Sequence, residues 1–178
     1  MAVPALVPAE HFGVMGRQHG EWISGVLIGE RPARFRMNAE QVESGAYMEL
    51  AVDLIEGYCV RRFATVDVHL MYPLERDLLS EDLEGTVRVD RYPAHRVFYQ
   101  MGTLAGDVVL HIFLVDIEGE TVFWKEMDAG QTVRFRFPTE RKVYYLRFPL
   151  RGFKDALERA TRLCNLPAAA GDRAYFEK

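Results

Sequence analysis

Residues 143–163 read VYYLRFPLRGFKDALERATRL, and this stretch decides the fold because it contains a strand pattern, a break and a helix pattern in succession. Tyr144, Leu146 and Phe148 fall on alternate positions, as expected for a strand with one buried face. Gly152 ends that pattern. Apolar residues then recur at helical spacing, at Phe153, Ala156, Leu157, Ala160 and Leu163. We therefore expect a strand followed at once by a short amphipathic helix that covers part of a sheet.

The rest of the chain contains mostly strand patterns, and one further short helix is expected at Val122–Asp128, ended by Gly130. Because helices do not alternate with the strands, a parallel α/β sheet is disfavoured. The chain is predicted to be mainly β, an antiparallel β-barrel or β-sandwich with a short C-terminal α-helix. The other expected strands are Glu21–Ile28, Ala33–Met37, Tyr47–Ile55, Val60–Met71, Thr86–Asp90, Val97–Gln100, Val108–Asp116 and Val133–Phe137.

The length of 178 residues predicts a single domain over 1–178. Within it we expect an irregular lead-in at 1–19, a β-rich core with the terminal helix at 20–164, and a loose tail at 165–178. Residues 73–85 are expected to form an acidic connection. Its carboxylates lack the glycine and the ligand order of a calcium-binding EF-hand loop, which favours a solvated loop.

Cysteine usage and the N-terminal segment bear on the compartment. Cys59 and Cys164 are far apart and belong to no motif, so we expect neither a disulfide framework nor a zinc site. The opening MAVPALVPAEHF has no basic n-region and does not resemble a signal peptide. The apolar runs are too short for a membrane span. If Met1 is the native start, these features predict a cytoplasmic protein.

Charge is distributed unevenly along the chain. The net charge is −4, which argues against a general affinity for nucleic acid. Arg134–Arg162 nevertheless carries nine basic and three acidic residues. This basic segment either forms a solvated face, attracts the acidic remainder of the chain, or docks an anionic partner. If it docks a partner, the outward residues Arg134, Arg136, Arg147 and Arg151 would contact an acidic protein surface or a small anionic ligand.

Aromatic residues alternate with the arginines in RFRFPTERKVYYLRFPLR, residues 134–151. Exposed aromatic rings beside arginines can stack on single-stranded bases, so a nucleic-acid-binding protein is a second alternative. However, Phe135, Phe137 and Phe148 occupy the positions that face a core. The pattern therefore favours a packed core with an arginine-bearing outer face.

No catalytic, metal-binding or cofactor-binding motif is present. The chain lacks HExxH, GxSxG, GxGxxG and Walker A patterns, so no cofactor is expected. His111, within an apolar strand pattern, is interpreted as a hydrogen-bonded histidine rather than a general base. His69 and Asp67 share one strand face, and together with His95 they define the enzyme alternative, a His/Asp pair in the mouth of a barrel.

Three co-linear landmarks over about residues 20–160 resemble the invasion-associated locus B family of bacterial periplasmic proteins. The first is Gly20-Glu21-Trp22, similar to the family's Gly-Asp-Trp at its first strand. The second is VDVHLMYPLERDLLSEDLEGTVRVD, residues 66–90, similar to a strand, a Pro-Leu connection and a strand ending in Val-Asp. The third comprises AGQTVRF at 129–135 and FPLRGFKDAL at 148–157, similar to a strand followed by the family's Leu-Lys-Gly-Phe.

This resemblance implies a β-barrel-like fold and no catalytic residue. The family typically carries a secretion signal and paired cysteines, which would fall near Val26 and Phe35 and near Met101 and Val108. Apolar residues stand there instead, so the chain resembles a cysteine-free relative suited to a reducing compartment. Together with the missing motifs, this favours a non-enzymatic binding or interaction protein.

Overall fold

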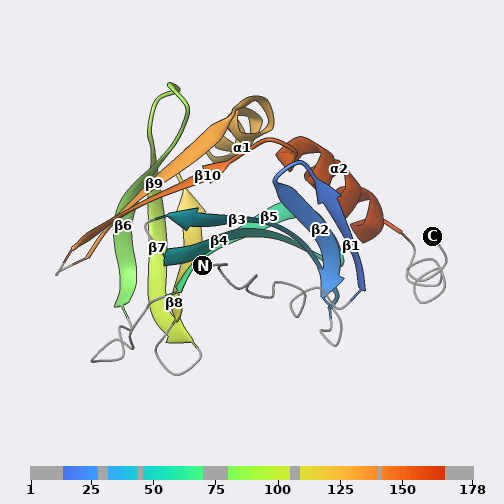
Figure 1. Ribbon diagram of the computed structural model, residues 1–178, viewed down its shortest axis with the longest axis horizontal. Coiled ribbons are helices and arrows are strands. Elements are labelled where there is room, and N and C mark those ends of the chain that lie inside the picture. The colour runs from blue at the N-terminus through green and yellow to red at the C-terminus, as the bar shows by residue number, and fades with distance from the viewer. Residues whose placement is uncertain are drawn as a thin grey trace, which may run out of the picture.

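The computed structural model describes residues 14–27, 32–43, 46–69, 80–104, 109–139 and 142–166, in which ten strands and two helices are present (Figure 1). In chain order these elements are β1 (Val14–His19), β2 (Trp22–Leu27), β3 (Arg34–Glu43), β4 (Ala46–Ile55), β5 (Tyr58–His69), β6 (Ser80–Val89), β7 (His95–Leu104), β8 (Val109–Ile117), α1 (Glu120–Ala129), β9 (Thr132–Pro138), β10 (Val143–Pro149) and α2 (Phe153–Cys164).

All ten strands belong to one antiparallel sheet, in the order β1-β2-β3-β4-β5-β8-β7-β6-β9-β10. The predicted mainly β fold with a C-terminal helix is confirmed. Within the described residues β1 and β10 do not pair, so the sheet is not closed into a barrel. It curls instead, and β9 and β10 lie above β3 and β4 in the view of Figure 1. Contacts between β10 and β3 show that this curl brings distant parts of the sheet together.

The core lies inside the curl, and strand alternation fills it as the sequence predicts. The buried side chains of β9 and β10 are those of Val133, Phe135, Phe137, Tyr144, Leu146 and Phe148, and the residues that alternate with them along each strand are partly or fully exposed. Helix α2 packs against β2 and β3 at the other side of the core. Its five predicted apolar residues, from Phe153 to Leu163, are all buried.

Two boundaries differ from the sequence prediction. The lead-in contains β1, because Gly20, at φ 61°, allows a tight turn that pairs Val14–His19 with β2. The acidic connection is shorter than predicted, since β6 already begins at Ser80. The remainder of the predicted lead-in, of the connection and of the tail, at 1–13, 73–79 and 167–178, lies outside the described residues.

The β1–β2 turn is joined to the turn between β10 and α2. The backbone N–H of Glu21 donates to the carbonyl oxygen of Arg151 at 2.9 Å. The indole Nε1 of Trp22 donates to the carbonyl oxygen of Pro149, also at 2.9 Å. The Trp22 ring meets the Phe153 ring edge-on, with 4.8 Å between centroids. The first and third family landmarks therefore touch each other in space.

This junction requires glycine on both sides. A Cβ added to Gly20 would lie 2.6 Å from the carbonyl oxygen of Arg151. Gly152 has φ 96°, a backbone conformation that L-residues rarely adopt, and a Cβ there would lie 1.7 Å from the carbonyl oxygen of His19. The two turns can approach this closely because neither glycine carries a side chain.

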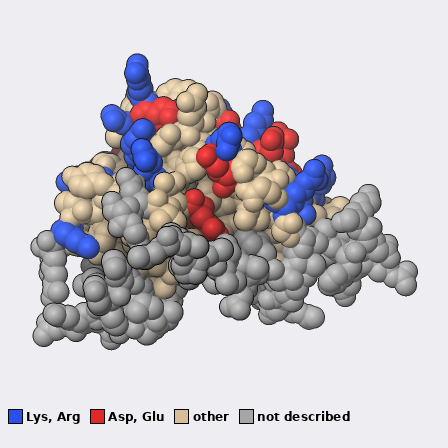
Figure 2. Space-filling model, viewed as in Figure 1, with Lys and Arg blue, Asp and Glu red and all other residues tan. Residues whose placement is uncertain are grey.

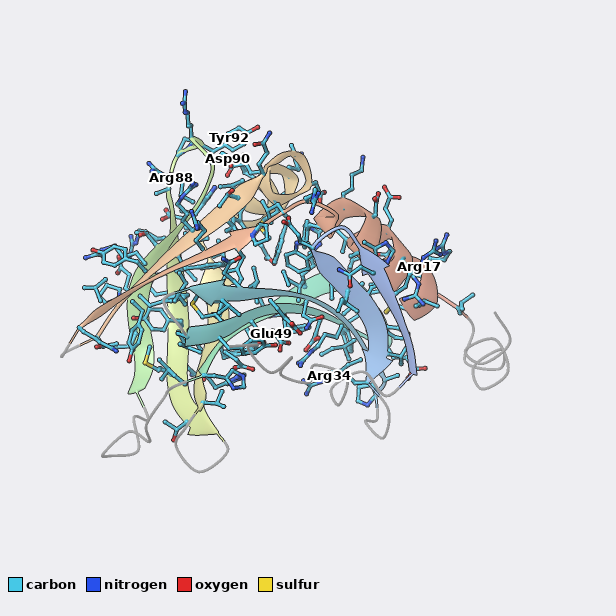
Figure 3. All side chains as sticks on the ribbon, viewed as in Figure 1. Arg17, Arg34, Glu49, Arg88, Asp90 and Tyr92 are labelled. Atoms are coloured by element: carbon cyan, nitrogen blue, oxygen red, sulfur yellow. A yellow bond between two sulfur atoms is a disulfide. The ribbon has the colours of Figure 1, made fainter. Side chains whose placement is uncertain are left out.

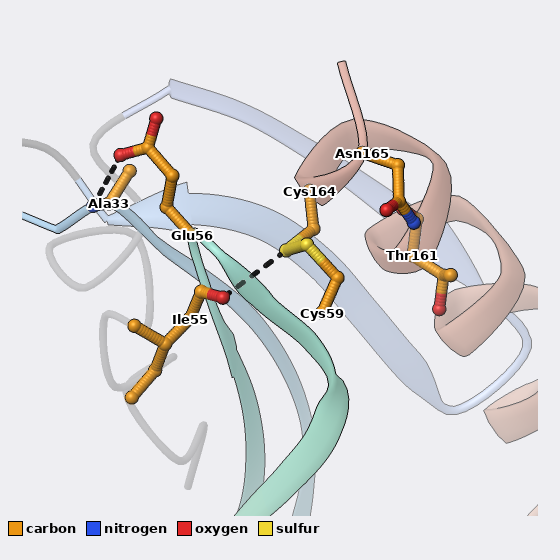
Figure 4. The surroundings of a disulfide bond; sticks show 7 residues. All are labelled: Ala33, Ile55, Glu56, Cys59, Thr161, Cys164 and Asn165. Atoms are coloured by element: carbon orange, nitrogen blue, oxygen red, sulfur yellow. Dashed lines mark hydrogen bonds between the residues drawn. A yellow bond between two sulfur atoms is a disulfide. The ribbon is translucent and has the colours of Figure 1, made fainter. Parts of the chain in front are cut away.

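A disulfide joins Cys59, at the start of β5, to Cys164, at the end of α2 (Figure 4). The expectation that these cysteines form no disulfide is wrong. They are 105 residues apart in sequence, but α2 folds back over the start of β5 and brings their Cα atoms to 5.7 Å. Stable structural disulfides are typical of proteins outside the reducing cytoplasm. The prediction of a cytoplasmic protein is therefore wrong, and the disulfide points to an extracytoplasmic one.

Neither α1 nor α2, the helices in the described ranges, has the length and apolar character needed to cross a membrane.

Candidate binding surface

Three arginines lie in one row across neighbouring strands. Arg134 of β9 is directly opposite Arg88 of β6 on one side and Arg147 of β10 on the other. All three side chains are exposed, because the residues flanking each of them along its strand face the core. Neighbouring strands are about 4.8 Å apart, so the row places three positive side chains within roughly 10 Å of sheet width.

The next row on the same face carries a fourth arginine and an aromatic ring. Arg136 of β9 is opposite Thr86 of β6 and Tyr145 of β10. The Tyr145 side chain is 71% exposed. We refer to the set formed by Arg88, Arg134, Arg136, Arg147 and Tyr145 as the arginine surface.

An open cleft of about 800 Å³ lies at one end of the arginine surface. Its position is fixed by Asp90, whose carboxylate accepts hydrogen bonds from the backbone N–H groups of Gln131 and Thr132 at 2.8 and 2.9 Å. These bonds hold the turn after β6 against the start of β9. Figure 3 shows Arg88, Asp90 and Tyr92 together at this end of β6, and Figure 2 shows Lys and Arg side chains in the same part of the molecule. The cleft is lined by Arg88, Asp90, Arg91, Tyr92, Gln131 and Arg134.

The structure brings together three of the four predicted binding arginines. Arg134, Arg136 and Arg147 share the arginine surface, whereas Arg151 lies in the turn before α2, with its guanidinium 3.5 Å from the Glu21 carboxylate. The sequence analysis did not single out Arg88. The signal was nevertheless present, because the inward positions of Val87 and Val89 require that Arg88 faces outward.

The three residues of the alternative polar site, His69, Asp67 and His95, each contact a different residue. Asp67 pairs with His111 on the neighbouring strand β8, with 2.5 Å between Oδ1 and Nδ1. This contact agrees with the interpretation of His111 as a hydrogen-bonded histidine. His69 instead meets the ring of Tyr47 edge-on, with 4.6 Å between centroids. Burial raises the pKa of the Tyr47 phenol, and the nearby Glu49 carboxylate raises it further.

His95 lies far from this pair and holds α1 against β7. Its Nδ1 donates to the carbonyl oxygen of Glu118 at 3.0 Å, and its Nε2 lies 2.8 Å from the Glu126 carboxylate. Gly102 is the β7 residue opposite His111, and it follows His95 by about seven residues, or roughly 23 Å of strand. The structure therefore does not bring His95 together with His69 and Asp67.

Comparison with known proteins identifies the fold. No family model matches the chain, and no curated protein matches it. Among solved structures, that of invasion-associated protein B from Bartonella henselae superposes with a TM-score of 0.57 at 15% sequence identity. The alignment covers 84% of this chain and 96% of that one. The fold is that of invasion-associated protein B. The resemblance predicted from the three landmarks is confirmed at the level of the fold.

The description of the chain as a cysteine-free relative is wrong, because Cys59 and Cys164 are paired. Val26 and Phe35, where cysteines were expected, lie directly opposite each other on β2 and β3 and are both buried. An apolar contact thus occupies that place. The disulfide carries the correction from a cytoplasmic to an extracytoplasmic protein.

Proposed function

We propose that this protein binds an acidic segment of a protein partner through the arginine surface and acts by binding rather than by catalysis. The observation that carries this proposal is the row formed by Arg88, Arg134 and Arg147. The row concentrates positive charge on one exposed strip of the sheet. An anionic partner would be attracted to this concentration of charge.

The side chains of the arginine surface suit carboxylates. A guanidinium can donate two parallel hydrogen bonds to one carboxylate, which gives direction as well as affinity. The exposed ring of Tyr145 beside Arg136 offers the kind of amphipathic contact that is enriched in protein interfaces. Phe135, Phe137 and Phe148 are buried and cannot stack on bases, so an acidic protein segment is favoured over a single-stranded nucleic acid.

The test measures binding of a fluorescent oligoglutamate peptide and of single-stranded oligothymidine to the oxidised protein. One variant replaces Arg134, Arg136 and Arg147 by glutamine. The matched control makes the same charge change at Arg17, Lys154 and Arg162, which are exposed on β1 and α2. We expect peptide binding that weakens with added salt and falls about tenfold in the first variant, because exposed ion pairs each contribute about 0.2–1 kcal/mol. The control should bind like the wild type.

Equal losses in the variant and the control would show that only net charge matters and would contradict the proposal. Tighter binding of oligothymidine than of the peptide would replace it with the nucleic-acid alternative.

A further inference from the structure

The sheet divides between β5 and β8. These strands pair from Thr65 opposite Phe113 to His69 opposite Val109. Before Thr65, β5 stays paired with β4, and beyond Phe113, β8 stays paired with β7. In the part of the chain that the structure describes, no strand pairs with the β8-facing edge of β5 between Tyr58 and Ala64. Among the described residues this is an open strand edge, of the kind that can pair with an added strand through its backbone N–H and C=O groups.

A groove follows this unpaired edge. Two adjoining clefts of about 490 and 200 Å³ share Arg61, Arg62, Glu120 and Trp124 in their walls. Together they extend along β5 from Val60 to Ala64, opposite α1 and the last residues of β8. Five strand residues span about 17 Å, which is the length of a short extended peptide. We call this feature the β5 groove.

The wall of the β5 groove contains the guanidinium of Arg62, and one of its nitrogens has no hydrogen-bond partner in the described part of the chain. Arg62 lies on the alternate positions of β5 that carry Ala64, Val66 and Val68, so its side chain turns toward the core side of the sheet. Its guanidinium lies over the Trp124 ring, 5.0 Å from the centroid. Nη1 is buried and has no hydrogen-bond partner among the described residues. Burial lowers the pKa of Arg62, and the charges of Asp128 and Glu120 oppose that shift.

An unpartnered carboxylate lies nearby on α1. Oδ1 of Asp128 is buried and has no hydrogen-bond partner in the described chain. Burial raises the pKa of Asp128, while the charge of Arg62 lowers it. The two groups attract each other through space, yet no ion pair or hydrogen bond joins them within the described ranges. Both residues line the larger cleft, so one wall of the β5 groove carries a positive and a negative side chain.

We propose that the β5 groove binds an extended peptide segment that adds to the free edge of β5, with a peptide carbonyl accepting from the Arg62 guanidinium and a peptide N–H donating to the Asp128 carboxylate. A peptide backbone supplies the acceptor and the donor in close succession, which matches the pair of charges on the wall. It also supplies the regularly spaced N–H and C=O groups that an unpaired strand edge requires.

The rim of the groove fits the side chains of such a segment. Val60 lines the larger cleft and is 96% exposed. Side chains of an added strand point alternately to the two faces of the sheet, so an apolar side chain of the peptide can cover Val60. This site lies apart from the arginine surface and does not depend on the function proposed there.

The test uses a displayed library of random peptides, selected on the oxidised full chain, and a synthetic version of the enriched sequence. Affinity is measured for the wild type, for Arg62→Met and for the control Arg17→Met, which removes an exposed arginine of β1. We expect Arg62→Met to weaken binding by roughly 10- to 100-fold, the loss typical of a hydrogen bond to a charged group. Arg17→Met should bind like the wild type.

Two further readouts separate binding from folding. Arg62→Met retains an unbranched chain over Trp124 and removes a buried unpartnered charge, so its thermal midpoint should not fall below that of the wild type. Hydrogen exchange should slow at the amides of residues 60–64 when the peptide is bound. The proposal is overturned if the library enriches no peptide, if the enriched peptide binds Arg62→Met as tightly as the wild type, or if its protected amides lie elsewhere.

Discussion

Replacing Gly152 by alanine tests whether the junction of the two turns holds α2 on the sheet. A residue with a Cβ at φ 96° costs about 1–2 kcal/mol of backbone strain. The added Cβ would also lie 1.7 Å from the His19 carbonyl oxygen, so the β1–β2 turn must move away. That movement breaks the hydrogen bonds donated by Glu21 and Trp22, worth about 0.5–1.5 kcal/mol each. We expect Gly152→Ala to lower the free energy of unfolding by about 2–5 kcal/mol.

The matched control is Gly57→Ala. Gly57 also has positive φ, at 83°, but a Cβ there would meet nothing within 4 Å. This variant should lose only the strain, about 1–2 kcal/mol. Urea denaturation of the oxidised proteins, followed by tryptophan fluorescence, gives both free energies. If Gly152→Ala costs no more than Gly57→Ala, the close approach of the turns does not determine how firmly α2 is held.

Two other predictions concern stability. The Cys59–Cys164 disulfide closes a loop of 105 residues, so its removal in the double alanine variant should lower the free energy of unfolding by up to about 5 kcal/mol. Unchanged urea midpoints with and without reductant for the wild type would contradict this, and reductant should not affect the variant. Burial raises the pKa of Tyr99 to about 12, from an ordinary 10, against the opposing charge of Arg136. The folded state therefore holds the phenolic proton more tightly, and this contribution is full below about pH 10 and is lost as the pH rises to about 12. Over that interval the free energy of unfolding should fall further for the wild type than for Tyr99→Phe, and parallel curves would refute the assignment.

Patterns that depend on neighbours in sequence predicted the structure well. The alternation at Phe135, Phe137 and Phe148 and the helical spacing of α2 are local, so β9, β10 and α2 were predicted close to their observed bounds. Gly130 ends α1 as predicted. Neither the order of the strands nor the open edge of the sheet could be derived in this way, because both depend on which distant strands meet.

Features that depend on long-range contacts were missed. Cys59 and Cys164 share no motif, and only the return of α2 to the start of β5 brings them together. The burial of Asp53 also depends on a long-range contact, since the Arg36 guanidinium donates two hydrogen bonds of 2.9 Å to its carboxylate. The sequence analysis also missed Arg62, although its signal is local. A charged residue at a core-facing position of β5 breaks the alternation of apolar and polar residues.

The position of the disulfide also determines when the chain can be oxidised correctly. With two cysteines in the sequence, Cys59 has a single possible partner within the chain, and that partner is the last residue of α2. During synthesis, which starts at the N-terminus, the thiol of Cys59 has no partner within the chain until the ten described strands have been synthesised. A chain truncated before α2 would keep a lone thiol and could form a disulfide only with another molecule. Intramolecular oxidation therefore reports that the whole sheet and its closing helix have emerged.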